Sequence, residues 1–439
     1  MTILAVGYYD DFARFFLAIK KELRNQKIKV TFNYFSIYLS GFLYSLATGH
    51  YATFFSLKVW VYTLIKYKKY KQLANSVTEY KSIKLANVIT YHVKLDPKSE
   101  QLYKMMALAY IDCIENVFKT YKPNLVILSG DSRMCIEIFK RQAKLLNIKT
   151  LFFEQGPFGT TILDQQGVNA NASIRNTVIK QSSLNQATQE KKINQFFSRK
   201  KYPKYKRIPI FRGSDYIFQL FCLWLKLVPI DIKMEPIKWT KSAAYSQIQY
   251  GTDTKESANK ILLILQVPYD VNMVHHSPFF NNHYSIVKAV FENLPPSTTL
   301  VVREHPLYKG KYEEKLYNYM LDNNIAMDVL NLDQSIDQAN VVVVNNSTVG
   351  IEAVAKYKPV VILGNAYYDL ELITLKLQQK NTLAQQLSKA ITWQPNEKDI
   401  LNFLEYFLFE FLIDGHYKDQ QLICIKKIAN IINLELQNN

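Results

Sequence analysis

The chain has 439 residues, of which 48% are hydrophobic and 21% are charged. This composition excludes an intrinsically disordered chain, and the length allows two or three domains with sizeable cores. Lysine and arginine number 54 against 37 aspartates and glutamates, which gives a net charge of +17. We therefore expect an anionic partner: nucleic acid, an anionic membrane surface or a phosphorylated substrate.

The N-terminus predicts a first β-strand and not a signal peptide, because no basic region precedes its apolar run and Asp10 and Asp11 follow it closely. The four cysteines are scattered and form no Cys-x-x-Cys pair, which argues against a zinc site and against a disulfide scaffold. Reduced thiols and a cytoplasmic location are the simplest expectation.

Residues 41–65 are rich in aromatic residues and leucine and approach the length of a transmembrane helix. Gly49, His50 and Lys58 make spanning unfavourable, so a buried or interfacial helix pair is predicted. The basic and aromatic run 66–71 follows. It is either a solvated helix end or a site that attracts acidic lipid headgroups.

A helix is predicted over 100–121, where apolar residues recur at helical spacing. Two strands follow, and each ends in polar residues beside a glycine: Gly130-Asp131-Ser132-Arg133 and Glu154-Gln155-Gly156. A carboxylate at a strand end can act as a general acid or base, or it can cap a turn or helix. Function is favoured for Glu154, because a solvated cap is more often aspartate or serine.

The stretch 159–173 has few charges and many hydrogen-bonding side chains, which predicts a sugar-contacting loop or a plain structural loop. Residues 186–212 are rich in lysine, and 217–228 are apolar and aromatic. A basic tract beside an aromatic helix is typical of an interfacial membrane anchor, and an interdomain helix is the alternative.

Residues 229–260 mark a boundary, and a second α/β unit follows. Its short β-branched runs alternate with helical segments, the pattern of a parallel sheet that is buried on both faces. Ligands of such sheets bind beyond the carboxyl ends of the strands. Polar residues follow these predicted strands: 260–265 is followed by Gln266-Val-Pro-Tyr-Asp270, 300–303 by Glu304-His305-Pro306, and 341–344 by Asn345-Asn346-Ser347-Thr348.

These strand ends suit the binding of a phosphate. Ser347 or Thr348 is placed to cap a helix that begins near Val349, where free N–H groups favour an anion. Pro306 restrains His305 to an extended backbone, so the imidazole points off the strand end and can donate to the same phosphate. The plainer alternatives are a simple helix cap and a loop histidine.

Several motifs occur in one order between residues 126 and 368, over half of the chain. They are Glu154-Gln155-Gly156, Asp164-x-x-Gly167-Val168-Asn169, Gln266-x-x-x-Asp270 with His276-Ser277, His305-Pro306 with Lys309-Gly310, and Asn346-Ser347-Thr348-Val349-Gly350-x-x-Ala353 continuing through Pro359 and Leu363-Gly364 to Ala366-x-Tyr368. The ordered set resembles the bacterial capsule polysaccharide biosynthesis family. This family includes retaining β-Kdo transferases that use CMP-Kdo, a CMP-activated ulosonic acid. A single motif would be weak evidence, whereas the series is specific.

The resemblance implies that Asp270 is a nucleophile that takes Kdo from CMP as a covalent intermediate, and that Glu154 is the acid/base for the acceptor hydroxyl. Without the resemblance, Asp270 would be interpreted as an ordinary turn residue. His305 would contact the CMP phosphate, so no metal or other cofactor is needed for CMP to depart. The other donor-binding candidates are Ser347, Thr348, Asn346, Gln266, Lys309 and Pro306.

Two departures from the family pattern concern the sugar contacts. Several relatives carry a second acidic residue where this chain has Gln155, and they often have an arginine shortly after the following glycine, where this chain has residues 158–160. Arg133 and Arg175 are the alternatives for contacting the donor carboxylate. The candidate sugar or acceptor contacts are therefore Asp131, Arg133, Gly156, Asp164, Asn169 and Arg175.

Together these features predict an α/β protein of two Rossmann-like domains, GT-B-like, with a cleft between them. The expected limits are 1–235 for the acceptor-side domain, 236–400 for the CMP-sugar domain and 401–439 for C-terminal helices that pack back across the junction. The predicted activity is transfer of Kdo from CMP-Kdo to a glycolipid or growing surface polysaccharide, in the cytoplasm at the bacterial inner membrane.

Two alternatives stay open at this point. One is an inverting, sialyltransferase-like CMP-ulosonic-acid transferase, in which Asp270 or Glu154 is a general base. The other is a non-catalytic, peripheral-membrane module that binds polysaccharide during assembly or export. An anionic membrane surface is an expected partner. Nucleic acid is not, because the chain carries no nucleic-acid-binding motif.

Overall fold

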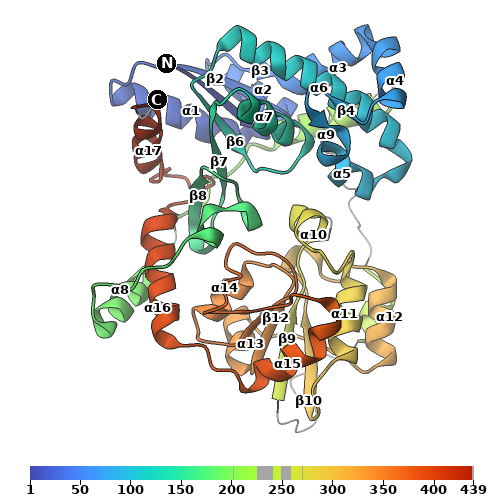
Figure 1. Cartoon of the computed structure of the whole chain (residues 1–439), viewed down its shortest axis with the longest axis vertical. Helices are drawn as coiled ribbons and strands as arrows, with labels where there is room; N and C mark the ends of the chain where they lie inside the picture. Colours follow the sequence, from blue (N-terminus) through green and yellow to red (C-terminus); the bar gives the residue numbers. More distant parts are fainter. Residues whose placement is uncertain (201, 225–240, 249–258, 269, 438–439) are drawn as a thin grey trace. The chain divides into compact units, whose positions relative to one another are not determined.

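The computed structural model describes residues 1–200, 202–224, 241–248, 259–268 and 270–437. These residues belong to two compact units (Figure 1). The first unit takes its residues from 1–168, 198–235 and 409–439, and the second from 169–197 and 236–408.

Among the described residues, the first unit contains a seven-stranded sheet in the order β15-β8-β7-β6-β1-β2-β3. The five strands β7, β6, β1, β2 and β3 are parallel to one another. Strand β8 is antiparallel to both of its neighbours, β7 and β15. The strands are β1 (Thr2–Gly7), β2 (Thr31–Ser36), β3 (Thr53–Phe54), β6 (Leu125–Ser129), β7 (Lys149–Gln155), β8 (Thr160–Asp164) and β15 (Ile413–Asp414).

Helices cover both faces of this sheet, so its central strands β1 and β6 are apolar on both faces and buried. Figure 1 shows α1 and α17 side by side, and they are in contact although they lie near opposite ends of the chain. The helices are α1 (Asp10–Asn25), α2 (Leu39–Ala47), α3 (Phe55–Ile65), α4 (Tyr67–Ser76), α5 (Leu85–Leu95), α6 (Glu100–Tyr121), α7 (Met134–Leu145), α9 (Pro209–Trp224) and α17 (Ile425–Gln437), with a small ribbon of β4 (Glu79–Tyr80) and β5 (Ile83–Lys84).

The second unit, in its described part, contains a six-stranded parallel sheet in the order β11-β10-β9-β12-β13-β14. Its strands are β9 (Asn259–Ile264), β10 (Thr298–Arg303), β11 (Ala326–Met327), β12 (Val341–Val344), β13 (Val360–Ile362) and β14 (Leu375–Lys376). Its helices are α8 (Gln186–Ser198, which ends at the unit boundary), α10 (Val271–His275), α11 (His283–Glu292), α12 (Glu314–Asp322), α13 (Leu332–Gln338), α14 (Val349–Val354), α15 (Leu383–Thr392) and α16 (Glu397–Glu405), followed by a π-helical turn, Tyr406–Phe411.

Both sheets have the strand order of a Rossmann fold. In each sheet, the first strand is followed by strands added in sequence on one of its sides, and the later strands are then added on its other side. The reversal lies between β1 and β6 in the first sheet and between β9 and β12 in the second. A crevice opens beyond the carboxyl ends at such a reversal, and this is where open α/β sheets bind ligands. The prediction of an α/β fold with two Rossmann-like units is confirmed.

Three details differ from the sequence-based expectations. The stretch 159–173 is not all loop, because residues 160–164 form β8, which pairs with β7 and β15. Residues 169–197, expected in the first domain, group with the second unit. The C-terminal part is also divided: α16 belongs to the second unit, and residues 409–439 belong to the first.

The stretch 41–65 is a pair of short helices, as predicted. In the described part of the chain, no helix combines the length and the apolar character that crossing a membrane requires. The basic run that follows is partly neutralised, because Lys66 and Lys69 lie 3.8 and 3.7 Å from the carboxylate of Asp112 in α6. All four cysteines are buried and free.

Candidate active site

The carboxyl edge of the second sheet brings the predicted donor-binding residues together. β9 and β12 are neighbours at the strand-order reversal, and the segments that follow them hold residues 266–270 and 345–348. β10, on the other side of β9, is followed by His305. Residues that are about 80 positions apart in sequence therefore converge because three adjacent parallel strands end at the same edge.

Asp270 stands immediately before the short helix α10. Its backbone carbonyl accepts hydrogen bonds from the N–H groups of Met273 and Val274, at 3.0 and 3.1 Å. One carboxylate oxygen has a weak contact with the side-chain amide of Asn272, at 3.4 Å. The backbone of Asp270 is thus fixed, while its half-buried carboxylate has only this one weak contact in the described residues.

The helix that carries Asp270 is tied to the end of β12. The side-chain Nδ2 of Asn346 donates to the backbone carbonyls of Asn272 and His276, at 3.0 and 3.1 Å. The backbone N–H of Asn365, after β13, donates to the carbonyl of His276 at 2.7 Å. Asn346, predicted to bind the donor, therefore uses its amide N–H groups to position α10.

Gln266 is the second residue beyond the end of β9, at the carboxyl edge of the sheet. Its backbone carbonyl accepts from the Tyr312 hydroxyl at 3.0 Å. Its side chain is buried, and neither the amide oxygen nor the amide nitrogen has a hydrogen-bond partner among the described residues. A buried amide without partners costs free energy, so this side chain is available to a polar ligand.

His305 follows β10 with an extended backbone, as Pro306 predicts. Its Nδ1 accepts a hydrogen bond from the backbone N–H of Leu307 at 3.3 Å, so the imidazole proton resides on Nε2. Burial lowers the pKa of His305, and the nearby charge of Asp270 opposes this shift. The ring is therefore neutral at pH 7, with Nε2–H free to donate.

Glu304 is a residue of this edge that the sequence reasoning did not single out. Its buried carboxylate accepts hydrogen bonds from the backbone N–H of Gly310 at 3.1 Å and from the Tyr317 hydroxyl. Burial raises the pKa of Glu304, and these two hydrogen bonds oppose the shift. The pair Glu304 and Gly310 holds the loop that carries His305 and the exposed Lys309. The signal in the sequence was an acidic residue directly after an apolar strand.

Ser347 and Thr348 precede α14. The Ser347 hydroxyl accepts from the backbone N–H of Val349 at 3.3 Å, so Ser347 and not Thr348 caps this helix. The Ser347 carbonyl accepts a hydrogen bond from the buried Tyr368 hydroxyl. A Cβ atom on Gly350 would lie 2.2 Å from that hydroxyl, which explains why glycine occupies this position.

Arg175 and Asn169 lie in the second unit and not in the first. The Arg175 guanidinium forms a bidentate pair with the carboxylate of Asp369, at 2.8 and 3.0 Å. The Asn169 side chain accepts from the Nδ2 of Asn272 at 3.3 Å. These contacts attach the segment 169–197 to the second unit, and they commit Arg175 to a protein carboxylate. The buried Asp369 was not predicted from the sequence.

The first unit holds the remaining candidates, and three of them stabilise its loops and turns. Asp131 accepts from the backbone N–H of Val168 at 2.9 Å. Asp164 accepts from the N–H groups of Gln166 and Gly167, at 2.7 and 3.1 Å. A Cβ atom on Gly156 would lie 2.2 Å from the hydroxyl of Thr160, so this glycine is required by the turn between β7 and β8.

Glu154 lies within β7 and not beyond its end, because the strand continues to Gln155 and pairs with β8. It is half-buried, and one carboxylate oxygen accepts from the backbone N–H of Gln155 at 2.9 Å. Tyr417 and Lys418 lie close enough to interact with its charge. The carboxylate is therefore held near a hydroxyl and an ammonium group, an environment that can support proton transfer.

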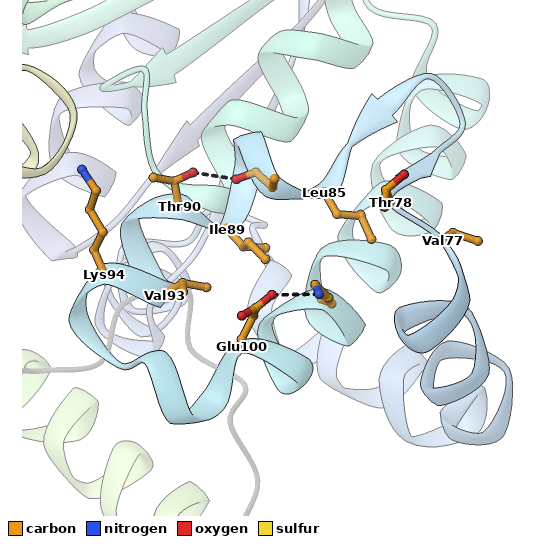
Figure 2. Close-up of a pocket in the computed structure, with 10 residues that line it drawn as sticks. Val77, Thr78, Leu85, Ile89, Thr90, Val93, Lys94 and Glu100 are labelled. Carbon is orange, nitrogen blue, oxygen red and sulfur yellow. Dashed lines mark hydrogen bonds and ion pairs between the residues drawn. The ribbon is translucent and has the colours of Figure 1, made fainter.

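A separate pocket of about 310 Å³ in the first unit is lined by α5, by the start of α6 and by the two residues that follow α4 (Figure 2). Figure 2 shows Ile89, Leu85 and Val93 directed into it, with Glu100 at its rim. Glu100 is paired with Lys104 at 2.8 Å. None of the predicted site residues lines this pocket.

Comparisons with known proteins place the chain in a family. The sequence model described as "Capsule polysaccharide biosynthesis protein" matches residues 138–405, more than half of the chain. Protein FixF of Sinorhizobium fredii is 26% identical over 183 residues, covering 40% of this chain and 43% of that protein. The capsule polysaccharide export protein KpsS of Escherichia coli is 27% identical over 126 residues, covering 26% and 32%. The chain thus aligns with less than half of the length of either relative.

Solved structures with similarity include the β-Kdo 2,7 transferase of Thermosulfurimonas dismutans KpsC, with 16% identity, a TM-score of 0.35, and coverage of 77% of this chain and 96% of that one. The UDP-GlcNAc 2-epimerase of Neisseria meningitidis has 13% identity, a TM-score of 0.33 and full coverage of both chains. From the match over residues 138–405, the chain belongs to the capsule polysaccharide biosynthesis family.

Proposed function

We propose that the chain is a glycosyltransferase of capsule or surface polysaccharide synthesis that transfers Kdo from CMP-Kdo with retention of configuration. The observation that supports this proposal best is the carboxyl edge of the second sheet. There, the Asp270 carboxylate and the Gln266 amide, which has no partner among the described residues, follow β9, and the neutral His305 follows the adjacent strand β10. This transfer needs a nucleophile, a hydrogen-bond donor for the phosphate and a polar contact for the sugar.

In the first step of the proposed mechanism, the Asp270 carboxylate attacks the anomeric carbon of Kdo, and the bond from that carbon to the phosphate oxygen of CMP breaks. In the second step, an acceptor hydroxyl attacks the same carbon, the bond to Asp270 breaks, and the hydroxyl proton passes to the carboxylate of Glu154. Two displacements at one carbon retain its configuration.

His305 would stabilise the departing CMP through a hydrogen bond and not through full proton transfer. Because burial lowers its pKa, the imidazole is neutral at pH 7 and its Nε2–H is the donor. The Ser347 hydroxyl follows β12, on the other side of β9, and is the second donor proposed for the phosphate.

Intact-protein mass spectrometry after incubation with freshly made CMP-Kdo tests this mechanism. The expected result is a mass increase of one Kdo residue in the parent and no increase in Asp270→Asn. An adduct that persists in Asp270→Asn would show that another residue is the nucleophile. CMP release with acceptor present but no adduct in any variant would favour the inverting alternative.

A second candidate function is polysaccharide binding during export, because the Escherichia coli relative is named as an export protein. A binding module needs no nucleophile, so Asp270→Asn would retain function in a capsule-complementation assay. Loss of surface polysaccharide in the variant, with normal protein levels, would argue against that candidate.

We also propose that the first unit binds the anionic inner face of a bacterial membrane through α9. The inner side of α9 packs on the first unit, where the Phe211 and Phe218 rings lie 5.6 and 5.2 Å from those of Tyr44 and Phe54. Its outer side exposes a stripe at helical spacing: Ile210 (74%), Ile217 (70%), Leu220 (65%), Phe221 (49%) and Trp224 (76%). A basic tract leads into this helix, as in interfacial membrane helices.

Flotation with lipid vesicles tests this part of the proposal. The parent should float with vesicles containing phosphatidylglycerol and less with pure phosphatidylcholine. The double variant Ile217→Ser/Trp224→Ser should lose most of the flotation. The control Leu434→Ser removes an exposed leucine from α17 of the same unit and should not change it. Equal flotation of the double variant and the parent would exclude α9 as the contact.

A further inference from the structure

The strand-order reversal of the first sheet carries a second cluster of polar side chains. Tyr8 follows β1 directly, and Arg133 lies four residues after the end of β6, immediately before α7. β1 and β6 are paired neighbours, so both residues stand at the carboxyl edge of the first unit where its own ligand crevice is expected.

Arg133 is held between aromatic rings. Its guanidinium carbon lies 5.4 Å from the ring centre of Tyr8 and 5.7 Å from that of Tyr91 in α5, both within cation–π range. Tyr38, which precedes α2, has its ring centre 6.5 Å from that of Tyr8 and 4.6 Å from that of Tyr9. Four tyrosines therefore surround this edge of the unit.

Arg133 has no anionic partner among the described residues, unlike the neighbouring arginines. Arg207 is paired with Asp10 and lies 3.6 Å from Asp11, and Arg212 is paired with Asp215 at 3.0 Å. No carboxylate or carbonyl within the described residues accepts a hydrogen bond from the Arg133 guanidinium. A partly buried cation with unused donors costs free energy unless a ligand supplies the anion.

Resting on the proposed function, we infer that Arg133, with Tyr8 and Tyr91, binds the carboxylate of an acidic sugar in the acceptor. The planar guanidinium presents two parallel N–H donors that match a carboxylate. The buried rings of Tyr8 and Tyr91 hold the guanidinium in place, which fixes the direction of these donors.

This assignment also separates the two arginines that the sequence left as alternatives. Arg175 is occupied by Asp369 in the second unit, whereas Arg133, in the first unit, donates to no carboxylate or carbonyl of the described residues. Arg133 is thus the one of the two that is open to a carboxylate, and we assign it to the acceptor because the first unit is the expected acceptor side.

The test is a calorimetric titration without CMP-Kdo. The probes are a short saccharide that ends in Kdo and the same saccharide with its carboxylate reduced to an alcohol. Arg133→Gln should bind the acidic saccharide about 10- to 100-fold more weakly than the parent, the loss expected for a charge-assisted pair. Arg133→Lys should bind it several-fold more weakly, since lysine keeps the charge but not the planar fork. The reduced saccharide should bind the parent and both variants alike.

The matched control is Arg141→Gln, which removes the same charge from α7 at a residue paired with Glu137 on the same helix. Its affinity for the acidic saccharide should equal that of the parent. Unchanged affinity in Arg133→Gln overturns the inference. So does inorganic phosphate that displaces the acidic saccharide from the parent at equal concentration, because the site would then be a phosphate site. If Arg133→Gln fails to fold, Arg133→Lys decides, and parent-like affinity in that variant overturns the inference.

A donor-side measurement separates this inference from the proposed function. The Kdo adduct on Asp270 should form at the parental rate in Arg133→Gln, because no acceptor is present. Loss of the adduct in that variant would place Arg133 on the donor and overturn the assignment. If the parent itself forms no adduct, the proposed mechanism fails, while the titration still decides whether Arg133 recognises a carboxylate.

Discussion

The two sheets have the same strand order at their reversals, but their edges differ in chemistry. At the edge of the second sheet, side-chain amides, a neutral histidine and a carboxylate follow β9, β10 and β12. At the edge of the first, tyrosines and an unpaired arginine follow β1 and β6. Under the proposals above, one fold serves two tasks: the second edge would carry the reaction at the sugar–phosphate bond, and the first would hold a charged saccharide.

The largest expected difference between the two edges comes from replacing one carboxylate at each edge by an amide. Asp270→Asn should lower the transfer rate by at least about 10³-fold with little change in stability, because the amide cannot attack carbon. Asp131→Asn should lower stability more than the rate per folded molecule, because Asp131 accepts the Val168 N–H. Initial rates and urea unfolding of both variants measure this, and a fully active Asp270→Asn would refute the proposed role.

Glu154→Gln tests the acid/base proposed for the first unit. The acceptor-dependent rate should fall about 10²- to 10⁴-fold, the usual contribution of a general base. Formation of the Kdo adduct should be unaffected, since the first displacement needs no proton from the acceptor. Stopped-flow release of CMP with and without acceptor measures both steps. An equal loss in both would assign Glu154 a structural role instead.

Gly350→Ala tests whether the second edge depends on close packing. The added Cβ would lie 2.2 Å from the Tyr368 hydroxyl, which must then leave the Ser347 carbonyl. We expect a loss of about 1–3 kcal/mol in the free energy of unfolding. Gly213→Ala in α9 is the control, because nothing lies within 4 Å of its added Cβ. It should be neutral or slightly stabilising, and chemical denaturation would detect the contrast.

An effect that is confined to acid pH concerns the stability of each unit. Burial lowers the pKa of His283 to about 4, whereas its pKa in the unfolded state is near 6.5. Between these two pH values, the unfolded state binds a proton that the folded state does not bind. Stability that is present above pH 6.5 is therefore lost as the pH falls towards 4, by about 2 kcal/mol at pH 5. His283→Gln should reduce the loss of unfolding free energy between pH 7.5 and 5 by that amount.

His416 in the first unit provides the counterpart, because burial lowers its pKa to about 4 as well. His416→Gln should reduce the acid sensitivity of the first unit in the same way. If neither variant changes the pH dependence in urea titrations, other groups control the acid stability of both units.

The sequence alone determined the α/β class, the alternation of strands and helices in the second unit and the convergence of its strand-end residues. It did so because buried parallel strands have an unmistakable apolar pattern and because their carboxyl ends share one edge. Helix α6, at Glu100–Tyr121, coincides with the prediction, since its apolar spacing is regular over six turns. Glu154 and Asp270 stay predictions, which rest on the family motifs; the structure places Asp270 after β9 and Glu154 within β7.

Only the tertiary structure decided which polar residues are already satisfied. Arg175 and Arg133 look alike in sequence, but Arg175 meets Asp369, 194 residues away, whereas Arg133 lies between tyrosines. Asn346 and Asp131 likewise turned out to hold neighbouring segments in place. Pairing depends on contacts between distant parts of the chain, which no local pattern records. Within the described residues, Gln266 has no side-chain hydrogen bond and Arg133 has no anionic partner, and both facts could be recognised only after folding brought their surroundings together.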